Sequence, residues 1–352
     1  HMFSVNRNKY LLFISMIFTA VMFILFASGC SATVAQGEAA MARQDGATDK
    51  VYEMSPSSLT PANQPPRVTI TALADGSTFT ERTAVTFDAG LTALDNANIT
   101  DLNNMTVLVG AGDIAGCGSQ KDLETALLLD NIPGTVFTLG DNVYPDGADL
   151  EFSDCYDPTW GRHKARTRPA PGNHDYHTSG ASGYFNYFGA AAGDADKGYY
   201  SYDVGDWHVI ALNSECAEVG GCEMGSPQGQ WLQADLAANP KACTLAYWHH
   251  PRFSSGWHGS NASYQDFWQL LYDAGADVVL NGHDHTYERF APQDPTGISD
   301  PGRGIREFVV GTGGAGLYSF GIPEPNSEVR ENSTHGVLKL TLHPTSYDWE
   351  LV

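Results

Sequence analysis

The sequence predicts an α/β domain over residues 105–352, and three observations support this fold class. Short apolar runs typical of buried strands recur along this part of the chain. Between them lie segments with helical periodicity, bounded by capping and helix-breaking residues. Polar side chains suited to bind metal ions follow directly after the strands, where open α/β sheets bind their ligands. Alternating strands and helices of this kind are typical of an α/β catalytic domain.

The chain begins with a segment that has the features of a secretory signal. His1-Met2 look like a cloning remnant and carry no argument, whereas Arg7 and Lys9 precede an apolar run over 10–27. The run ends in Ala27-Ser28-Gly29-Cys30, which resembles a bacterial lipoprotein cleavage site at which Cys30 would be lipidated. An uncleaved membrane anchor and simple secretion are the alternatives. A signal peptide over 2–30 would place the rest of the chain outside the cytoplasm of a bacterium, either secreted or attached to the membrane.

Two further segments precede the α/β domain. Residues 31–66 are rich in Ala, Gln, Gly, Ser, Asn and Pro without an apolar period, which predicts a flexible tether. Residues 67–104 contain two alternating runs on either side of Asp75-Gly76, which predicts a short β-hairpin. This hairpin resembles the opening strands of an immunoglobulin-like module, but a complete sandwich needs about 100 residues. We therefore expect a short remnant without chemistry of its own.

Within 105–352 the elements follow in order. A helix begins near Ser119 and is broken at Pro133-Gly134, a second opens at Ser226-Pro227, and a third ends at Gly275. Strands are predicted at 106–109, 135–139, 244–248, 278–280, 307–310, 337–340 and 346–351.

Several cysteines follow the signal segment, and disulfides are expected among them because an extracytoplasmic compartment is oxidising. Cys216 and Cys222 are close in sequence across a Gly-rich loop and are predicted to pair. Cys117 and Cys155 each follow a proposed metal loop, so a disulfide between them would link two segments at the edge of the site. Cys243 begins an apolar strand, which favours a buried thiol, although it could compete for Cys222.

The formal net charge of −22 over 352 residues argues against nucleic acid or an anionic membrane surface as a partner. It does not exclude a small anionic substrate, because bound cations invert the local field. The sequence therefore predicts no nucleic-acid partner, and membrane contact only through the N-terminal lipid or anchor.

Five loops each follow a strand, and each presents side chains of the kind that bind metals. Carboxylate, imidazole, phenol and amide groups together suit iron, zinc or manganese better than copper(I). In the last of these loops, His283-Asp284-His285 on an extended backbone would point both imidazoles to one face. The loops contain Gly112-Asp113, Gly140-Asp141-Asn142-Val143-Tyr144, Gly172-Asn173-His174-Asp175, His249-His250-Pro251 and Gly282-His283-Asp284-His285.

Taken together, these loops resemble the metallophosphoesterase superfamily, and within it the purple acid phosphatase branch. The resemblance covers residues 105–352 and rests on Gly-Asp-Asn-x-Tyr at 140–144, Gly-Asn-His-Asp at 172–175 and Gly-His-x-His-x-Tyr-Glu-Arg at 282–289. It implies a four-layer α/β/β/α sandwich and a centre of two metal ions bridged by Asp141. The first ion would also take Asp113, Tyr144 and His285. The second would also take Asn173, His249 and His283.

One departure from the superfamily pattern selects the branch. Most members have Asp-x-His in the first motif, whereas Asp113 is followed here by Ile114-Ala115. In purple acid phosphatases a tyrosine replaces that ligand, which corresponds to Tyr144. The resemblance implies Fe(III) beside this phenolate and Zn, Fe(II) or Mn at the second position. His249 is preferred to His250 because the family's ligand lies two residues before the proline.

The resemblance also implies the reaction, in which a metal-bound hydroxide attacks a small phosphate monoester. His174 and His258 would bind the phosphate and protonate the leaving group, with Asn173 also contacting substrate and Asp175 orienting His174. A phosphodiesterase or nucleotidase on the same site is the enzymatic alternative, and a non-catalytic surface binding protein is the remote one. Asp284 is expected to point away from the metals. His163 and His208 are expected to lie outside the site.

Overall fold

The computed structural model describes Ser31–Ala32 and residues 106–352. The predicted signal segment, the tether after residue 32 and the hairpin at 67–104 lie outside these described residues. Ser31–Ala32 form strand β1, which pairs in parallel with Ser346 and Tyr347, so the first two residues of the predicted tether are a short strand instead. Across the described ranges, we find no helix with the length and apolar character needed to span a membrane.

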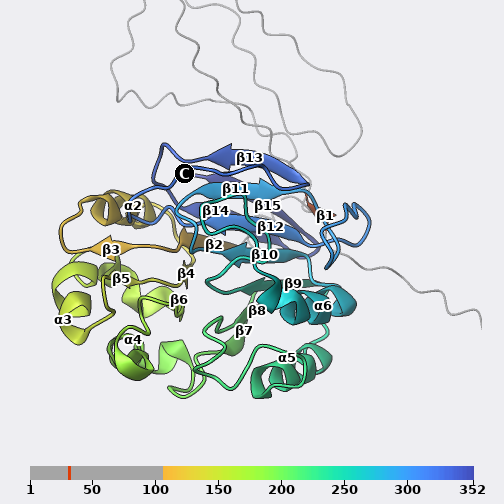
Figure 1. The fold of residues 1–352 in the computed structure, drawn as a ribbon, viewed down its shortest axis with the longest axis horizontal. Helices are drawn as coiled ribbons and strands as arrows, with labels where there is room; N and C mark the ends of the chain where they lie inside the picture. Colours follow the sequence, from red (N-terminus) through yellow and green to blue (C-terminus); the bar gives the residue numbers. More distant parts are fainter. Residues whose placement is uncertain (1–30, 33–105) are drawn as a thin grey trace, which may run out of the picture. The chain divides into compact units, whose positions relative to one another are not determined.

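The described residues form two main β-sheets (Figure 1). The first has the strand order β1-β15-β14-β2-β4-β6 and the second β13-β11-β12-β10-β9-β8-β7. In the first sheet β2, β4 and β6 run parallel, and in the second β8, β9, β10 and β12 do. The strands of the first sheet are β2 Thr106–Ala111, β4 Thr135–Leu139, β6 Thr167–Ala170, β14 Leu338–His343 and β15 Ser346–Leu351. Those of the second are β7 Tyr200–Val204, β8 Trp207–Ala211, β9 Cys243–Tyr247, β10 Val278–Asn281, β11 Tyr287–Phe290, β12 Arg306–Val310 and β13 Ser327–Glu331.

The second sheet is buried on both faces, which explains the continuous apolar runs in its strands. Alternate residues of one strand point to opposite faces. Leu245 and Tyr247 of β9 pack into a core shared with the first sheet, whereas Ala246 of the same strand packs into a second core. That second core contains Phe267, Trp268 and Leu271 of helix α6 (Gln265–Ala274) and Leu232 of α5 (Pro227–Ala238). The two sheets therefore face each other, with helices outside.

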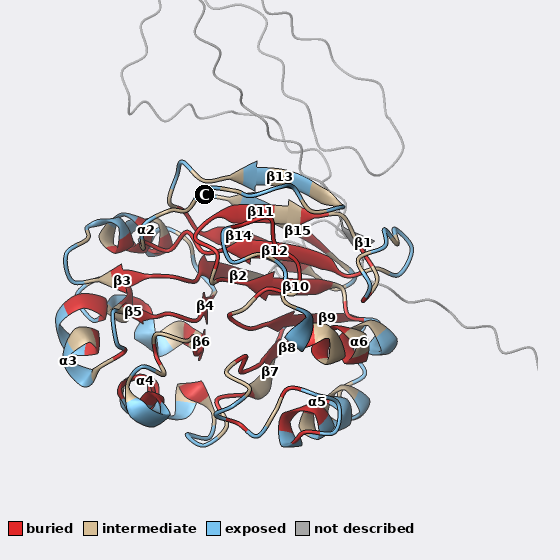
Figure 2. Cartoon of the chain, viewed as in Figure 1, coloured by how far each residue is buried: buried red, intermediate tan, exposed pale blue. Residues whose placement is uncertain are grey.

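The first sheet is covered on its other side by the remaining helices, which completes the four-layer α/β/β/α sandwich. Helices α2 (Lys121–Asp130) and α4 (Ser182–Phe188) bury residues on this side, and the short helix α3 (Asp149–Glu151) lies beside α4. In Figure 1 they lie to one side of the strands, and α5 and α6 lie to the other. Figure 2 shows the central strands buried and the outward helix faces exposed. The α/β fold class and the four-layer architecture are confirmed.

The helix boundaries follow the predicted signals. The Ser226 hydroxyl accepts the backbone N–H of Gly229 at 3.1 Å and caps α5, with Pro227 in the first turn. Helix α6 ends at Gly275, whose φ of 80° is the left-handed conformation that favours glycine. Helix α2 begins at Lys121, whose N–H is accepted by the Ser119 hydroxyl at 3.0 Å.

Several elements have little local signal in the sequence. Strand β6 contains Arg168 and Pro169, yet it forms by parallel pairing with β4. Strand β11 is absent from the predicted strands, and it forms by antiparallel pairing with both β12 and β13. On either side of β6, between residues 149 and 188, the chain forms short helical segments around an aromatic cluster that includes Phe152, Tyr156 and Phe188. Long-range packing, and not periodicity, decides these segments.

The disulfides agree with two predictions and correct one. Cys117 pairs with Cys155, and Cys216 pairs with Cys222. Cys243 is also disulfide-bonded, so the expectation of a free buried thiol at this position is wrong.

Candidate metal centre

The loops that carry the predicted ligands leave the same edge of the structure from both sheets. Asp113 follows β2, Asp141 follows β4, and His249 and His283 follow β9 and β10. The carboxyl ends of parallel strands meet at one edge. Backbone hydrogen bonds join the two sheets there, because Gly112 N–H donates to the Val310 carbonyl at 2.9 Å and Gly313 N–H donates to the Gly112 carbonyl at 2.9 Å. Residues far apart in the sequence are thereby brought to one place.

The Tyr144 phenol oxygen is the centre of one group of predicted ligands. It lies 3.0 Å from Asp113 Oδ1, 3.1 Å from Asp141 Oδ2 and 3.1 Å from His285 Nε2. His285 Nε2 is also 3.2 Å from Asp113 Oδ1. These four side chains are the set that the sequence resemblance grouped around the first metal ion.

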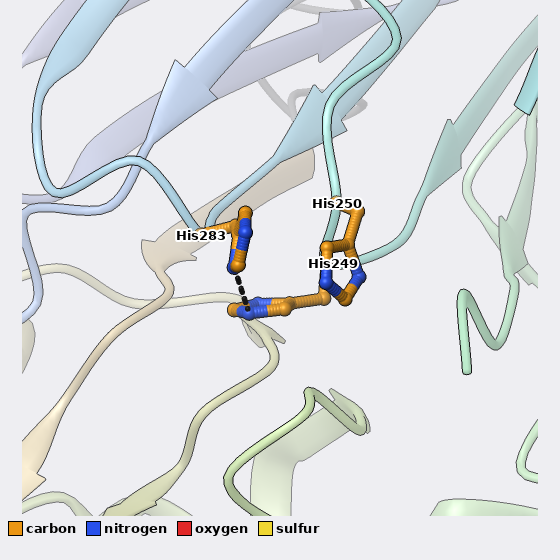
Figure 3. A group of neighbouring side chains, drawn as sticks. All are labelled: His249, His250 and His283. Atoms are coloured by element: carbon orange, nitrogen blue, oxygen red, sulfur yellow. Dashed lines mark hydrogen bonds between the residues drawn. The ribbon is translucent and has the colours of Figure 1, made fainter. Parts of the chain in front are cut away.

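The His249 ring is the centre of a second group. Its Nε2 atom lies 3.1 Å from Asn173 Oδ1, 3.2 Å from His283 Nδ1 and 3.3 Å from Asp141 Oδ2. Figure 3 shows His249 and His283 facing each other from neighbouring loops, with His250 beside them. Asp141 Oδ2 belongs to both groups, so one carboxylate oxygen lies between the two clusters. The structure brings together all seven predicted ligands.

Carbonyl oxygens behind the site orient two of the histidines. His249 Nδ1 lies 2.7 Å from the Leu139 carbonyl, and His285 Nδ1 lies 2.7 Å from the Gly316 carbonyl. A carbonyl accepts only, so each Nδ1 carries a proton, and Nε2 is the atom directed into the cluster, where it can bind a metal ion in place of a proton. This arrangement is typical of metal-binding histidines.

Backbone conformation at the site is unusual. Asp113, Asp141 and His283 have φ values of 60°, 49° and 69°, which non-glycine residues rarely adopt. The expectation of an extended His283-Asp284-His285 segment is therefore wrong. The left-handed turn at His283 presents Nδ1 of this ring to one cluster, while Nε2 of His285 reaches the other.

Charges inside the site are strongly coupled. Burial of the His249 ring lowers its pKa, but the Asp141 carboxylate outweighs this and raises the pKa to about 10. Burial raises the pKa of Asp141, but the nearby His249 and His174 outweigh burial and hold this pKa well below the ordinary range. A metal ion competes with this proton for the same lone pairs.

The donor set fits bound cations. Burial raises the pKa of Tyr144 well above 10, and the neighbouring carboxylates Asp113 and Asp141 raise it further. The ionised carboxylates among these buried oxygen atoms give the cluster a negative potential, which a bound metal ion would cancel. On the His249 side, burial and the rings of His249, His250 and His258 lower the pKa of His283, which leaves a neutral imidazole suited to metal binding.

His174 lies at the exposed edge of the clusters. Its backbone N–H donates to Asp141 Oδ1 at 2.8 Å, and its ring Nε2 lies 4.0 Å from Asp141 Oδ2. The ring packs against Tyr144 with centroids 4.4 Å apart, and Nδ1 lies 2.6 Å from the Pro145 carbonyl. His177 approaches the same carbonyl at 3.1 Å.

The predicted role of Asp175 in orienting His174 is wrong. The Asp175 carboxylate is fully buried and accepts the Gly172 N–H at 2.9 Å and the Asn142 amide Nδ2 at 3.0 Å. It therefore ties together the loops that carry Asp141 and Asn173. Burial, followed by repulsion from Asp141, raises its pKa to about 7.

His258 and His250 each pack against the ring of His283. The centroid of each ring is 4.1 Å from that of His283. His250 Nδ1 lies 2.9 Å from the Ser214 hydroxyl and 3.3 Å from Glu215, and burial lowers its pKa to about 3. This ring is therefore neutral and held from outside the clusters, which matches the expectation that His250 lines the site.

Other sequence candidates lie where we expected. His163 contacts the Ala126 carbonyl and His208 pairs with Asp203 and Asp235, both away from the clusters. Asp284 points away from the predicted ligands and accepts the Ser254 hydroxyl. Gly311, which directly follows β12, packs against Asp113, and a Cβ at this position would lie 2.8 Å from the Asp113 carboxylate.

Two participants were missed in the sequence. Tyr318 stacks on His285 with centroids 4.0 Å apart and an interplanar angle of 9°, and no local pattern marks it. Glu288 belongs to the Tyr-Glu-Arg motif at 287–289, and its place shortly after the two histidines is the signal in the sequence that points to it.

Comparison with known proteins supports the same identification. Residues 99–287 match the calcineurin-like phosphoesterase family. The chain is 31% identical over 268 residues to purple acid phosphatase 21 of Arabidopsis thaliana, covering 66% of this chain and 58% of that protein. It is 35% identical over 159 residues to purple acid phosphatase 22 of the same plant, covering 40% of this chain and 34% of that protein. The chain thus spans less than two thirds of these relatives.

Solved structures agree on the fold. A purple acid phosphatase from yellow lupin seeds superposes with a TM-score of 0.54 at 20% identity, covering 70% of this chain and 51% of that one. GAP50, the anchor in the inner membrane complex of Plasmodium, superposes with a TM-score of 0.53 at 15% identity, covering 70% of this chain and 84% of that one.

Proposed function

This chain belongs to the calcineurin-like phosphoesterase family, and we propose that it is a binuclear metal-dependent phosphatase acting on small phosphate monoesters. The observation that carries the proposal is the convergence of seven side chains into two clusters that share Asp141 Oδ2. The curated relatives, which are purple acid phosphatases, support the same activity.

In this proposal the cluster around Tyr144 holds one cation and the cluster around His249 holds the other. Asp113, Asp141, Tyr144 and His285 would bind Fe(III), because a phenolate favours a ferric ion. Asp141, Asn173, His249 and His283 would bind Zn, Fe(II) or Mn. When bound, the two cations would activate water as a nucleophile and neutralise charge on the phosphoryl group.

The protein's own residues would then orient the ester and supply protons. His174 and His258 flank the clusters on their exposed sides. The Pro145 carbonyl fixes Nδ1 of His174, so Nε2 is the atom that can donate a proton to the departing alkoxide. His258 would hydrogen-bond to a phosphate oxygen. The amide of Asn173 would also contact substrate at the edge of the second cluster.

We propose an extracytoplasmic location. The bridges Cys117–Cys155 and Cys216–Cys222 support it, because structural disulfides persist in oxidising compartments. Simple secretion and an uncleaved anchor are two forms that this location can take, and attachment through a lipid at Cys30 would require that its sulfur take no part in a disulfide.

The decisive experiment combines metal analysis with two substrates. Protein purified without chelator should contain two metal ions and hydrolyse p-nitrophenyl phosphate faster than bis(p-nitrophenyl) phosphate, and chelation should abolish both activities. Replacing His174 with Asn should lower kcat by about 100-fold or more, whereas His177→Asn, at a neighbouring ring on the same carbonyl, should have a small effect. A metal-loaded protein that hydrolyses neither ester would overturn the proposal, and faster diester hydrolysis would favour a phosphodiesterase.

A further inference from the structure

The segment that carries His258 lacks regular secondary structure. We call residues 252–258 the His258 loop. Its middle residues Ser254, Ser255 and Gly256 are buried, whereas Trp257 and His258 are exposed at its end. An irregular loop depends on side-chain partners for its backbone hydrogen bonds. What holds this loop therefore decides where the His258 ring lies.

Glu288 holds the middle of the loop. The carboxylate is fully buried in strand β11. Its Oε2 accepts the Ser255 N–H at 2.7 Å, and its Oε1 accepts the Ser255 hydroxyl at 2.6 Å and the Ser327 hydroxyl at 2.5 Å. Charged acceptors make short and strong hydrogen bonds. Ser255 is thus held at two atoms by one carboxylate.

Asp284 holds the far end of the loop, and Glu307 holds its start. Asp284 Oδ2 accepts the Ser254 hydroxyl at 2.6 Å, and Oδ1 accepts the backbone N–H of His258 itself at 2.8 Å. Glu307 Oε1 accepts the N–H groups of Arg252 and Phe253. Three buried carboxylates therefore replace the backbone partners that a strand or helix would supply.

Two of these anchors lie in the segment that also carries two predicted metal ligands. Residues 283–288 contain His283 and His285 at the clusters, with Asp284 and Glu288 pointing toward the His258 loop. The His258 ring comes to lie 4.1 Å from that of His283. The chain thus couples the placement of His258 to the metal centre through one short segment.

From these contacts we infer that Glu288, together with Asp284, is a positioning residue that holds His258 in place over the metal centre. The inference rests on the proposed phosphatase function and deepens it. It assigns a role to the Tyr-Glu-Arg end of the motif, which contains none of the predicted metal ligands. Glu288 acts through Ser255 and the loop backbone and does not touch substrate.

A double-mutant cycle tests whether Glu288 acts through His258. Glu288→Gln removes one acceptor oxygen at nearly constant volume and should lower kcat/KM by about tenfold to 100-fold, because displacement of a catalytic group by about 1 Å has such an effect. Ser255→Ala, which removes the hydroxyl contact, should act in the same direction and more weakly. In a His258→Ala background neither change should lower kcat/KM further, because the group they position is gone. Glu331→Gln is the matched control, since that carboxylate also accepts from a serine N–H and hydroxyl, those of Ser333, away from the loop.

A second measurement reports on the loop without using activity. Amide hydrogen exchange of the peptide covering 252–258 should be faster in Glu288→Gln and Ser255→Ala than in the wild type, with metal content unchanged. Additive losses of kcat/KM in the cycle, or unchanged exchange in both variants, would overturn the inference.

Failure of the proposed function gives a different result. If the metal-loaded wild type hydrolyses no ester, amide hydrogen exchange of the His258 loop and the affinity for inorganic phosphate still test whether Glu288 positions His258. Faster exchange with weaker phosphate binding in Glu288→Gln would support it. Unchanged binding would overturn it.

Discussion

The phenol oxygen of Tyr144 lies 3.1 Å from Nε2 of His285, although 141 residues separate them in the sequence. One residue follows a strand of the first sheet, and the other follows a strand of the second. They meet because the two sheets pack face to face with the carboxyl ends of their parallel strands at the same edge. The metal centre is thus a property of the sandwich and of neither sheet alone.

Replacing Tyr144 with Phe should remove the visible charge-transfer absorption of protein purified with iron. The phenolate is the only proposed ligand that gives such a band with Fe(III), and Phe keeps the ring without the oxygen. The measurement is an absorption spectrum together with metal content. Tyr318→Phe is the control, because that ring also contacts His285 but stacks on its face. A band that survives in Tyr144→Phe would refute the assignment of this residue to iron.

His249→Ala should lose one of the two metal ions, whereas His250→Ala should retain both. His249 Nε2 faces Asp141, Asn173 and His283, while Nδ1 of His250 faces Ser214. Loss of the second ion from His249→Ala should lower kcat by about 100-fold or more. Metal analysis after gel filtration measures the outcome. The opposite pattern in these adjacent histidines would move the ligand to His250.

Glu307→Gln should become more stable, relative to the wild type, as pH rises. Burial, with a further contribution from Glu288, raises the pKa of Glu307 well above its usual 4.5. Above that pH the unfolded chain loses this proton while the folded chain retains it, so the unfolding free energy of the wild type falls as pH rises. Gln cannot ionise, so the variant lacks this decline.

Urea denaturation at about pH 5 and about pH 8 measures this difference. Glu331→Gln is the control, because contacts with Ser333 lower the pKa of Glu331; its carboxylate stabilises the fold at both pH values, so the loss of stability in this variant should be nearly the same at both. A Glu307→Gln variant whose stability relative to the wild type falls as pH rises would contradict the prediction.

Removing the Cys117–Cys155 bridge should cost more stability than removing Cys216–Cys222. The bridges close loops with sequence separations of 38 and 6 residues. The chain-entropy model assigns about 4 kcal/mol to the longer loop and about 2 kcal/mol to the shorter one. Denaturation of the two Cys→Ala double variants measures this order. Equal losses would indicate that contacts in the folded state, and not loop entropy, dominate.

Much of the secondary structure could be predicted because its causes are local. The apolar run at 135–139 and the caps at Ser226 and Gly275 express preferences of a few neighbouring residues, and they occur as predicted. Strand β6, with Arg168 and Pro169, has no such local cause and depends on pairing with β4. Strand β11 likewise depends on β12 and β13.

The candidate site follows the same division. Motif residues such as Asp141 and His283 could be identified because metal binding demands particular donor types at particular spacings. The contacts of Asp175 could not be predicted, because this carboxylate, although next to His174 in sequence, accepts hydrogen bonds from Gly172 and Asn142. Adjacency in sequence says little about where a side chain points when the backbone turns sharply.

The sequence by itself determined the α/β class, the pairs Cys117–Cys155 and Cys216–Cys222, and the donor residues of the candidate site. Only the tertiary structure decided that Asp141 Oδ2 lies between the two clusters and that Glu288 reaches the His258 loop. It also decided that a left-handed turn at His283 directs His283 to one cluster and His285 to the other. The physical reason is the distance along the chain over which each interaction acts. Donor chemistry and helix or strand preference reside in single residues and near neighbours, whereas the placement of those groups depends on sheet register and on packing between segments that are far apart in the chain.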